Sequence, residues 1–264
     1  MSDERFRHFS IRIEESIGWL EFNRPPVNAF DWEMMREAPL ALHTLIDDPT
    51  VRVIVIASAL EKHFNSGADL KVFREVRGPR MREWVGICHG QLVPLLRGSP
   101  KPLLAAIHGV AVGGGLEITW HCDVRFASED ARIGQPEINI AYLPPIGATQ
   151  TLARLIGRNR ALRFLYDGDL LSAREACEIG LVDHVVPGVR LREEVRAYAR
   201  KLSQKPANAL AAIRRCVTEG GALPFHDGLQ IEFEEAVRLS ESPNFEEGIA
   251  AFLEKRPPHW RQTS

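Results

Sequence analysis

Short apolar runs alternate with stretches of helical spacing along the first 190 residues. A short, continuous apolar run is typical of a buried strand, whereas a helix repeats its apolar positions every three or four residues. We therefore expect strands at residues 17–22, 51–57, 103–107, 124–127 and 182–186. Helical patterns separate most of these runs, and Asp31 is placed to cap the first helix. This alternation predicts an α/β fold.

The pattern changes near residue 190. Four amphipathic helices are expected from there on, in "LREEVRAYARKLSQ", "PANALAAIRRCVTEG", "PFHDGLQIEFEEAVRLS" and "SPNFEEGIAAFLEKR". Their apolar faces must pack on the core, on one another or on a neighbouring subunit. The sequence thus predicts an α/β core at residues 1–190 and a helical C-terminal region at residues 191–264.

Composition and charge narrow the class of protein. The 264 residues are 45% hydrophobic, but the longest apolar runs are shorter than the roughly 20 residues of a membrane span. The N-terminus lacks a signal-peptide pattern and the four cysteines lie far apart, so we expect reduced thiols, no metal site and a cytoplasmic location. Because 33 basic residues balance 35 acidic ones, the net charge does not favour nucleic acid as a partner.

One segment is locally basic. The stretch "KVFREVRGPRMR", residues 71–82, carries five basic side chains and one acidic one. It is either a solvated helix face or a contact for an anionic group such as a phosphate.

Three consecutive glycines interrupt "GVAVGGGLEI", residues 109–118, between an apolar strand and an apolar helical stretch. The chain contains neither of the common glycine-rich nucleotide motifs. A strand that runs through a glycine turn into a helix leaves backbone N–H groups unpaired. The turn "NSGAD" after the strand at residues 51–57 has the same character. If the N–H groups of Ala68 and Gly114 converge, they form an oxyanion hole, which binds a carbonyl oxygen as it gains charge.

Two carboxyl groups lie close to these turns in the sequence. We expect Glu117 in the first turn of a helix, where the helix dipole favours the charged form; taken alone, it is also consistent with a solvated side chain. Glu137 follows a Gly-Gln-Pro turn within an apolar stretch, and apolar surroundings favour the protonated form.

Taken together, these segments resemble the enoyl-CoA hydratase/isomerase family, also called the crotonase superfamily. The resemblance covers nearly the whole chain through "EFNRPPVNAF", "HFNSGADLKVF", "GVAVGGGLEI", "IGQPEINI", "GLVDHVV" and "AFLEKR". It implies a crotonase-like spiral of ββα units. The helical C-terminal region would then form trimers, commonly two of which make a hexamer.

The resemblance also assigns roles to particular residues. The N–H groups of Ala68 and Gly114 match the oxyanion hole, and Glu117 and Glu137 match the two catalytic glutamates. In the implied mechanism Glu117 orients and deprotonates water, and Glu137 protonates the α carbon. This mechanism requires no metal or redox cofactor. The CoA is part of the acyl-CoA substrate.

Further positions match contacts with the CoA moiety. Phe64, Ser66 and Ala68 belong to the loop "HFNSGADL", along which the adenine and pantetheine of CoA lie in the family, so their backbone groups are candidate contacts. Lys71 and, from a neighbouring subunit, Lys255 match positions associated with the phosphates. For both lysines a solvated surface charge is the alternative.

The sequence departs from the family pattern at Pro145, which stands where many hydratases have glycine and which has no N–H to donate. If that amide helps to hold the water, its loss weakens hydration or reshapes the pocket. Tyr142, Trp120 and Phe73 are expected in the hydrophobic core rather than in an acyl pocket.

The leading hypothesis is an enoyl-CoA hydratase acting on a 2-enoyl thioester. The alternatives within the fold are a Δ3,Δ2-enoyl-CoA isomerase and a specialised hydroxyacyl-CoA dehydratase or C–C lyase. A different class, a non-catalytic acyl-CoA or RNA binding module, is disfavoured by the near-neutral charge and by the glutamate pair.

Overall fold

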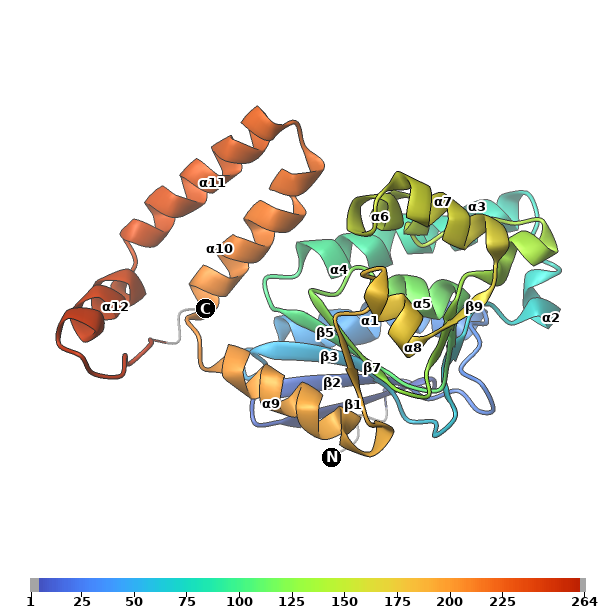
Figure 1. Cartoon of the computed structure of the whole chain (residues 1–264), viewed down its shortest axis with the longest axis horizontal. Helices are drawn as coiled ribbons and strands as arrows, with labels where there is room; N and C mark the ends of the chain where they lie inside the picture. The colour runs from blue at the N-terminus through green and yellow to red at the C-terminus, as the bar shows by residue number, and fades with distance from the viewer. Residues whose placement is uncertain (1–4, 262–264) are drawn as a thin grey trace.

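The computed structural model describes residues 5–261 as an α/β body from which a set of C-terminal helices extends (Figure 1). Its strands are β1 (Phe9–Glu14), β2 (Ile17–Phe22), β3 (Val53–Ser58), β4 (His63–Ser66), β5 (Leu103–Ile107), β6 (Val110–Val112), β7 (Val124–Ser128), β8 (Arg132–Gly134), β9 (Leu170–Ser172) and β10 (His184–Val186).

Helices connect and cover these strands. They are α1 (Trp32–Asp47), α2 (Leu70–Phe73), α3 (Pro79–Ile87), α4 (Val93–Gly98), α5 (Gly113–Thr119), α6 (Ala148–Leu155), α7 (Arg158–Asp167), α8 (Ala173–Glu178), α9 (Leu191–Ser203), α10 (Ala207–Thr218), α11 (Phe225–Ser240) and α12 (Pro243–Leu253). Shorter helical turns are η1 (Cys88–Leu92), η2 (Pro136–Ile140), η3 (Gly188–Arg190) and η4 (Gly220–Ala222). No helix in residues 5–261 combines the length and apolar character that crossing a bilayer requires.

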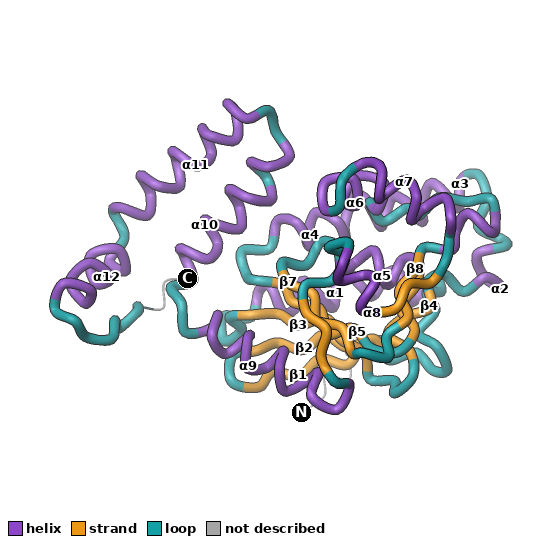
Figure 2. The backbone as a smooth tube through the Cα atoms, viewed as in Figure 1, coloured by secondary structure: helices purple, strands orange, loops and turns teal. Residues whose placement is uncertain are grey.

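The strands form two sheets, of which the smaller lies near α2 (Figure 2). The larger sheet has the order β1-β2-β3-β5-β7-β10 and is parallel except for the β1–β2 pair. The smaller sheet has the order β4-β6-β8-β9. Strands β3, β5 and β7 in the larger sheet are followed by β4, β6 and β8 in the smaller one, and each pair then leads into a helical segment. This repetition is the ββα spiral that the family resemblance implied.

The central strands are buried on both faces, which explains why their sequences read as continuous apolar runs. On one face of the sheet, Trp19, Val55 and Leu104 pack with Leu191 and Val195 of α9. On the other face, the remaining strand residues pack with α1, α4 and α5. Figure 1 shows α9 below the sheet and these other helices above it.

All four predicted C-terminal helices are present as α9 to α12. The first covers the sheet, whereas α10, α11 and α12 extend away from it (Figure 1). The division into two domains at residue 190 stays a prediction.

The five predicted strands correspond to β2, β3, β5, β7 and β10, with ends that differ by at most two residues. Asp31 caps α1, since its carboxylate accepts a hydrogen bond from the Met34 N–H. The strands of the smaller sheet were not predicted, because segments of three or four residues are too short to show a period.

Candidate active site

Two neighbouring strand ends bring the predicted oxyanion-hole residues together. Strands β4 and β6 are parallel, with Ser66 opposite Val112, so the two glycine turns leave the sheet side by side. A Cβ atom on Gly113 would lie 3.1 Å from the Gly67 Cα, and the Gly113 φ of 59° also favours glycine. This close approach places Ala68 and Gly114 on the wall of one cavity.

The N–H groups of these two residues are available to a ligand. The Phe30 N–H donates to the Gly67 carbonyl, and the Phe30 carbonyl accepts from the Asp69 N–H. In this parallel pairing the N–H of Ala68, which lies between Gly67 and Asp69, faces away from Phe30. Gly114 is the second residue of α5, where a helix leaves its N–H groups unpaired. Neither N–H has a backbone acceptor within residues 5–261.

Glu117 lies in the second turn of α5 and is fully buried. Its Oε2 accepts hydrogen bonds from the Ile146 N–H at 2.7 Å and the Ala148 N–H at 3.0 Å, and its Oε1 has no partner among the described residues. Burial raises the pKa of this carboxyl well above its usual value, the nearby Glu137 raises it further, and the two amides partly oppose the shift. The expectation of a first-turn carboxylate kept charged by the helix dipole is therefore wrong, because the helix begins at Gly113 and desolvation is the larger effect.

Glu137 reaches the same cavity from η2. Its Oε1 lies 3.0 Å from the position that a Cβ on Gly113 would occupy, and its Oε2 is buried without a partner in the described chain. Burial raises the pKa of Glu137 to about 7, as its apolar sequence context indicated. Since two neighbouring buried carboxyls do not ionise together easily, the pair retains a proton near neutral pH.

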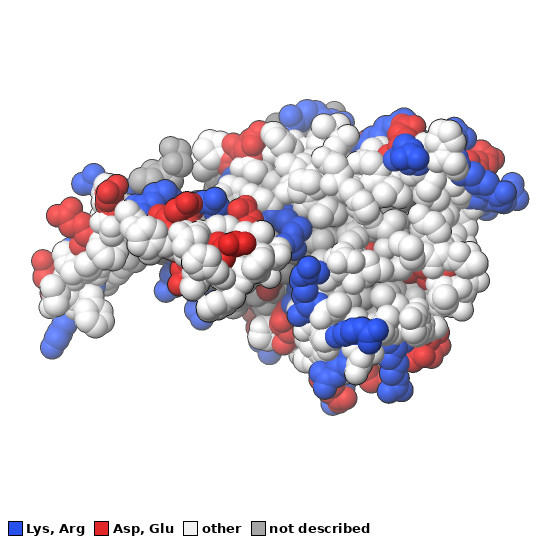
Figure 3. All heavy atoms as spheres, turned by 90° about the horizontal axis from the view of Figure 1, so that it is seen from above, with Lys and Arg blue, Asp and Glu red and all other residues white. Residues whose placement is uncertain are grey.

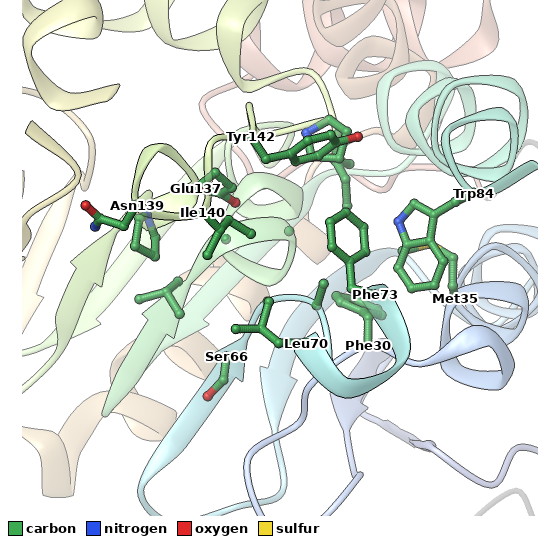
Figure 4. Close-up of a pocket in the computed structure, with 18 residues that line it drawn as sticks. Phe30, Met35, Ser66, Leu70, Phe73, Trp84, Glu137, Asn139, Ile140 and Tyr142 are labelled. Carbon is green, nitrogen blue, oxygen red and sulfur yellow. The ribbon is translucent and has the colours of Figure 1, made fainter. Parts of the chain in front are cut away.

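The cavity between these groups has a volume of about 230 Å³. Figure 4 shows Phe30, Met35, Phe73 and Trp84 gathered on one side and Glu137, Asn139 and Ile140 on the other. It is lined by Phe30, Met35, Ser66, Gly67, Ala68, Leu70, Phe73, Trp84, Val112, Gly113, Gly114, Pro136, Glu137, Asn139, Ile140, Tyr142, Pro145 and Ile146. Glu117 is absent from this lining and is fully buried.

Ion pairs fix the loop that carries Ala68. The Arg24 guanidinium donates to Asp31 at 2.9 Å, to Asp69 at 3.1 Å and to the Ala29 carbonyl at 2.9 Å. It thereby joins the turn "NRPPVNAF" to the residue that follows Ala68. These contacts give Arg24 in "EFNRPPVNAF" and Asp69 in "HFNSGADLKVF" a structural role.

The sequence profile of the enoyl-CoA hydratase/isomerase family matches residues 12–263. The chain belongs to the enoyl-CoA hydratase/isomerase family. A probable enoyl-CoA hydratase of Bacillus subtilis is 32% identical over 96% of this chain and 98% of that protein. A crotonyl-CoA hydratase of Syntrophomonas wolfei is 32% identical over 95% of this chain and 96% of that protein.

The fold agrees with this family. The crystal structure of an enoyl-CoA hydratase from Geobacillus kaustophilus superposes with a TM-score of 0.94 at 32% identity, covering 100% of this chain and 99% of that one. The α/β spiral with C-terminal helices is thus the crotonase fold that the sequence motifs implied.

Only some of the residues predicted to contact CoA lie at the cavity. Ser66 and Ala68 line the cavity, whereas Phe64 does not: its ring packs on Phe22 in the core, and its carbonyl accepts from the Asn28 side chain at 3.0 Å. Lys71 is exposed on α2, whose neighbouring residues Leu70 and Phe73 line the cavity. Lys255 follows α12, at the opposite end of the molecule from α2 (Figure 1). Only a neighbouring subunit could bring a Lys255 to this site.

The prediction that Trp120, Phe73 and Tyr142 lie in the hydrophobic core is wrong for two of them. Trp120 is buried against Phe164, as predicted for a core residue. Phe73 and Tyr142 instead line the cavity, because their rings close its side between α2 and the turn after η2.

Pro145 also lines the cavity, and its carbonyl lies 2.6 Å from His89 Nε2. The amides that hold Glu117 Oε2 belong to Ile146 and Ala148, which follow Pro145 in the chain.

Sequence reasoning missed the residues at the closed end of the cavity, chiefly Phe30, Met35, Trp84 and Ile146. All four are at most 2% exposed. In the sequence they are indistinguishable from ordinary core positions, and only the tertiary structure shows that they face an open space.

Proposed function

We propose that this protein is an enoyl-CoA hydratase, which adds water across the double bond of a 2-enoyl-CoA thioester. The observation that carries the proposal is that two unpaired N–H groups and the Glu137 carboxyl line one apolar cavity, with the buried Glu117 carboxyl next to Glu137. Each of these carboxyls has an oxygen without a partner among the described residues. Hydration needs a polarised thioester carbonyl, a base for water and an acid for the α carbon, and this site offers a group for each task.

In the proposed reaction the thioester oxygen accepts hydrogen bonds from the Ala68 and Gly114 N–H groups. The reacting form of the pair is the one in which its retained proton is on Glu137 and Glu117 is the carboxylate. Water adds to the β carbon while Glu117 Oε1 takes its proton, and the double-bond electrons move toward the carbonyl as an enolate. Glu137 then gives its proton to the α carbon, and solvent exchange returns the pair to its starting state. Acid–base groups of this kind contribute about 10²–10⁴ in rate, and one oxyanion-hole donor about 10²–10³.

A Δ3,Δ2 isomerisation is the second candidate. It is favoured by one observation: Glu137 lines the cavity, whereas Glu117 is fully buried and absent from the lining. A single carboxyl that moves a proton between the α and γ carbons suffices for isomerisation, and water need not enter.

The two candidates are separated by their substrates. Purified protein is mixed with crotonyl-CoA, loss of the enoyl-thioester absorbance is followed, and the product is identified by mass. We expect the addition of one water, and a large loss of this activity in Glu117→Gln with CoA binding retained. Turnover of 3-butenoyl-CoA without hydration of crotonyl-CoA would instead establish the isomerase, and unchanged hydration by Glu117→Gln would refute the role given to that carboxyl.

We also propose that the phosphates of CoA bind next to the basic segment at residues 71–82. Its position beside the cavity supports this, because Leu70 and Phe73 of α2 line the cavity and Lys71 and Arg74 are exposed. On the face seen in Figure 3, acidic and basic side chains are interspersed rather than separated by sign, which gives less support to an RNA-binding role.

A trimer, or a hexamer of two trimers, is the proposed assembly. Its support is the row of exposed apolar side chains on α10, α11 and α12, which includes Val217 at 71%, Phe233 at 66% and Phe252 at 83% exposed. The mass of the particle in solution tests it, and a monomer would contradict it. A cytoplasmic location stays a prediction from the widely spaced cysteines.

A further inference from the structure

An aromatic wall formed by Phe73, Trp84 and Tyr142 lines the cavity of the candidate site. Phe73 and Tyr142 close its side, and Trp84 belongs to its closed end. The Phe73 ring lies edge-to-face on Trp84, with centroids 5.8 Å apart at 72°, and on Tyr142, with centroids 5.2 Å apart at 73°. Figure 4 shows Phe73 between the other two rings. The catalytic groups do not need this wall, so it bears on which acyl group the cavity accepts.

The burial of the lining residues shows which end of the cavity is open. Leu70 is 57% exposed and Ile140 is 47% exposed, whereas Met35 and Trp84 are at most 2% exposed. A thioester must therefore enter between Leu70 and Ile140. With its carbonyl at the Ala68 and Gly114 amides and its CoA at the mouth, its acyl group extends toward the aromatic wall.

The wall is held in place from behind. Trp84 packs edge-to-face against Trp32, with centroids 5.0 Å apart at 77°. The Tyr142 hydroxyl donates to the Met81 Sδ at 3.1 Å, which fixes its ring in the cavity lining. The rings thus form a preorganised surface, and ordering it costs little when a ligand binds.

Size agrees with a ring-bearing acyl group. A closed apolar cavity of about 150 Å³ accommodates benzene, and the cavity here measures about 230 Å³. A crotonyl group ends one methyl beyond the double bond and leaves most of the aromatic wall uncovered. An aryl ring on the β carbon would reach it and meet other rings at the edge-to-face distances that such rings prefer.

We propose that the acyl group of the physiological substrate carries an aryl ring, as in a 3-arylpropenoyl (cinnamoyl-type) thioester. This inference rests on the proposed function, because it places the thioester carbonyl at the two amides.

Saturated acyl-CoA analogues test the proposal by binding alone. Because they have no double bond to hydrate, differences in reactivity among enoyl substrates do not enter the comparison. The dissociation constants of 3-phenylpropanoyl-CoA, 3-cyclohexylpropanoyl-CoA and nonanoyl-CoA are measured by calorimetry. The three share nine acyl carbons but differ in ring and aromaticity. We expect the phenyl analogue to bind roughly 2- to 12-fold more tightly than the other two, which corresponds to the usual contribution of aromatic pairs beyond buried area.

A variant shows whether the aromatic wall is the cause. Phe73→Leu keeps an apolar side chain at a partly buried position, so folding is less affected than by replacing the buried Trp84. We expect it to abolish the preference for phenyl while nonanoyl-CoA binding stays within twofold. Equal binding of the three analogues by the unaltered protein, or an unchanged preference in Phe73→Leu, would overturn the inference.

Hydration of crotonyl-CoA is measured on the same preparation. If that reaction occurs and the phenyl preference is absent, only this inference fails. If no enoyl thioester is turned over, the proposed function fails, whatever the binding constants show.

Discussion

Replacement of Glu137 by glutamine should make the protein less active but, at high pH, relatively more stable. The folded-state pKa of Glu137 is raised from 4.5 to about 7 by burial. A carboxyl with a raised pKa contributes stability below its unfolded-state pKa, and this contribution is lost as the pH rises through the folded-state value. Glutamine has the same size and does not ionise, so Glu137→Gln escapes that loss.

The magnitude follows from the shift. From 4.5 to about 7 is about 2.5 pKa units, and each unit corresponds to about 1.36 kcal/mol, which gives about 3.4 kcal/mol over the whole titration. Most of it falls between about pH 5 and pH 8, and the partial solvent contact of the side chain reduces it to about 1–2 kcal/mol. The free energy of unfolding of Glu137→Gln, minus that of the unaltered protein, should rise by this amount across the interval.

Denaturant unfolding at fixed protein concentration measures this difference at each pH, since any assembly makes stability concentration-dependent. Glu234→Gln, on the exposed surface of α11, is the matched control and should show no such trend. Hydration by Glu137→Gln should fall about 10²–10⁴-fold at every pH. A stability difference that is constant or that shrinks with rising pH would refute the reasoning about burial.

Two further predictions concern the glycine turn and the basic segment. A Cβ on Gly115 would lie 2.1 Å from the Asn65 Cγ, so Gly115→Ala should lower the free energy of unfolding by about 1–3 kcal/mol or more in denaturant melts. Gly114→Ala meets only the end of the Ile146 side chain at 3.0 Å and should cost less; equal losses would contradict this packing argument. Replacing Lys71 and Arg74 by glutamine should raise the KM for crotonyl-CoA several-fold but leave the KM for crotonyl-pantetheine, which lacks the nucleotide phosphates, unchanged. An equal rise for both substrates would contradict a phosphate contact.

The central elements and the convergence of the two turns could be predicted from the sequence. Strands buried on both faces, such as β2, β3 and β5, read as apolar runs, and the amphipathic helices α9 to α12 have clear periods. The glycine run was interpreted as freeing N–H groups for a ligand. The close contacts of Gly113 with Gly67 and of Gly115 with Asn65 were not predicted and are seen only in the structure.

The environment of the carboxyls could be predicted only in part. Glu137 lies in an apolar stretch of sequence, and its burial follows from that. The burial of Glu117 depends on Ile146 and Ala148, which come from a segment 29 and 31 residues away and supply the amides that hold it. Neighbouring residues in the sequence carry no sign of such a contact. The shape of the cavity depends in the same way on Trp84 and Tyr142, which reach it from separate segments.

The most direct test of the account separates the two carboxyls by their tasks. Hydration of crotonyl-CoA and exchange of the α protons of butanoyl-CoA with deuterated water are measured for the unaltered protein, Glu117→Gln and Glu137→Gln. Exchange needs the oxyanion hole and Glu137 but no attack by water, so Glu117→Gln should lose hydration by orders of magnitude and retain most of the exchange, while Glu137→Gln should lose both. Exchange that survives in Glu137→Gln, or that falls in parallel with hydration in Glu117→Gln, would contradict the proposed division of roles.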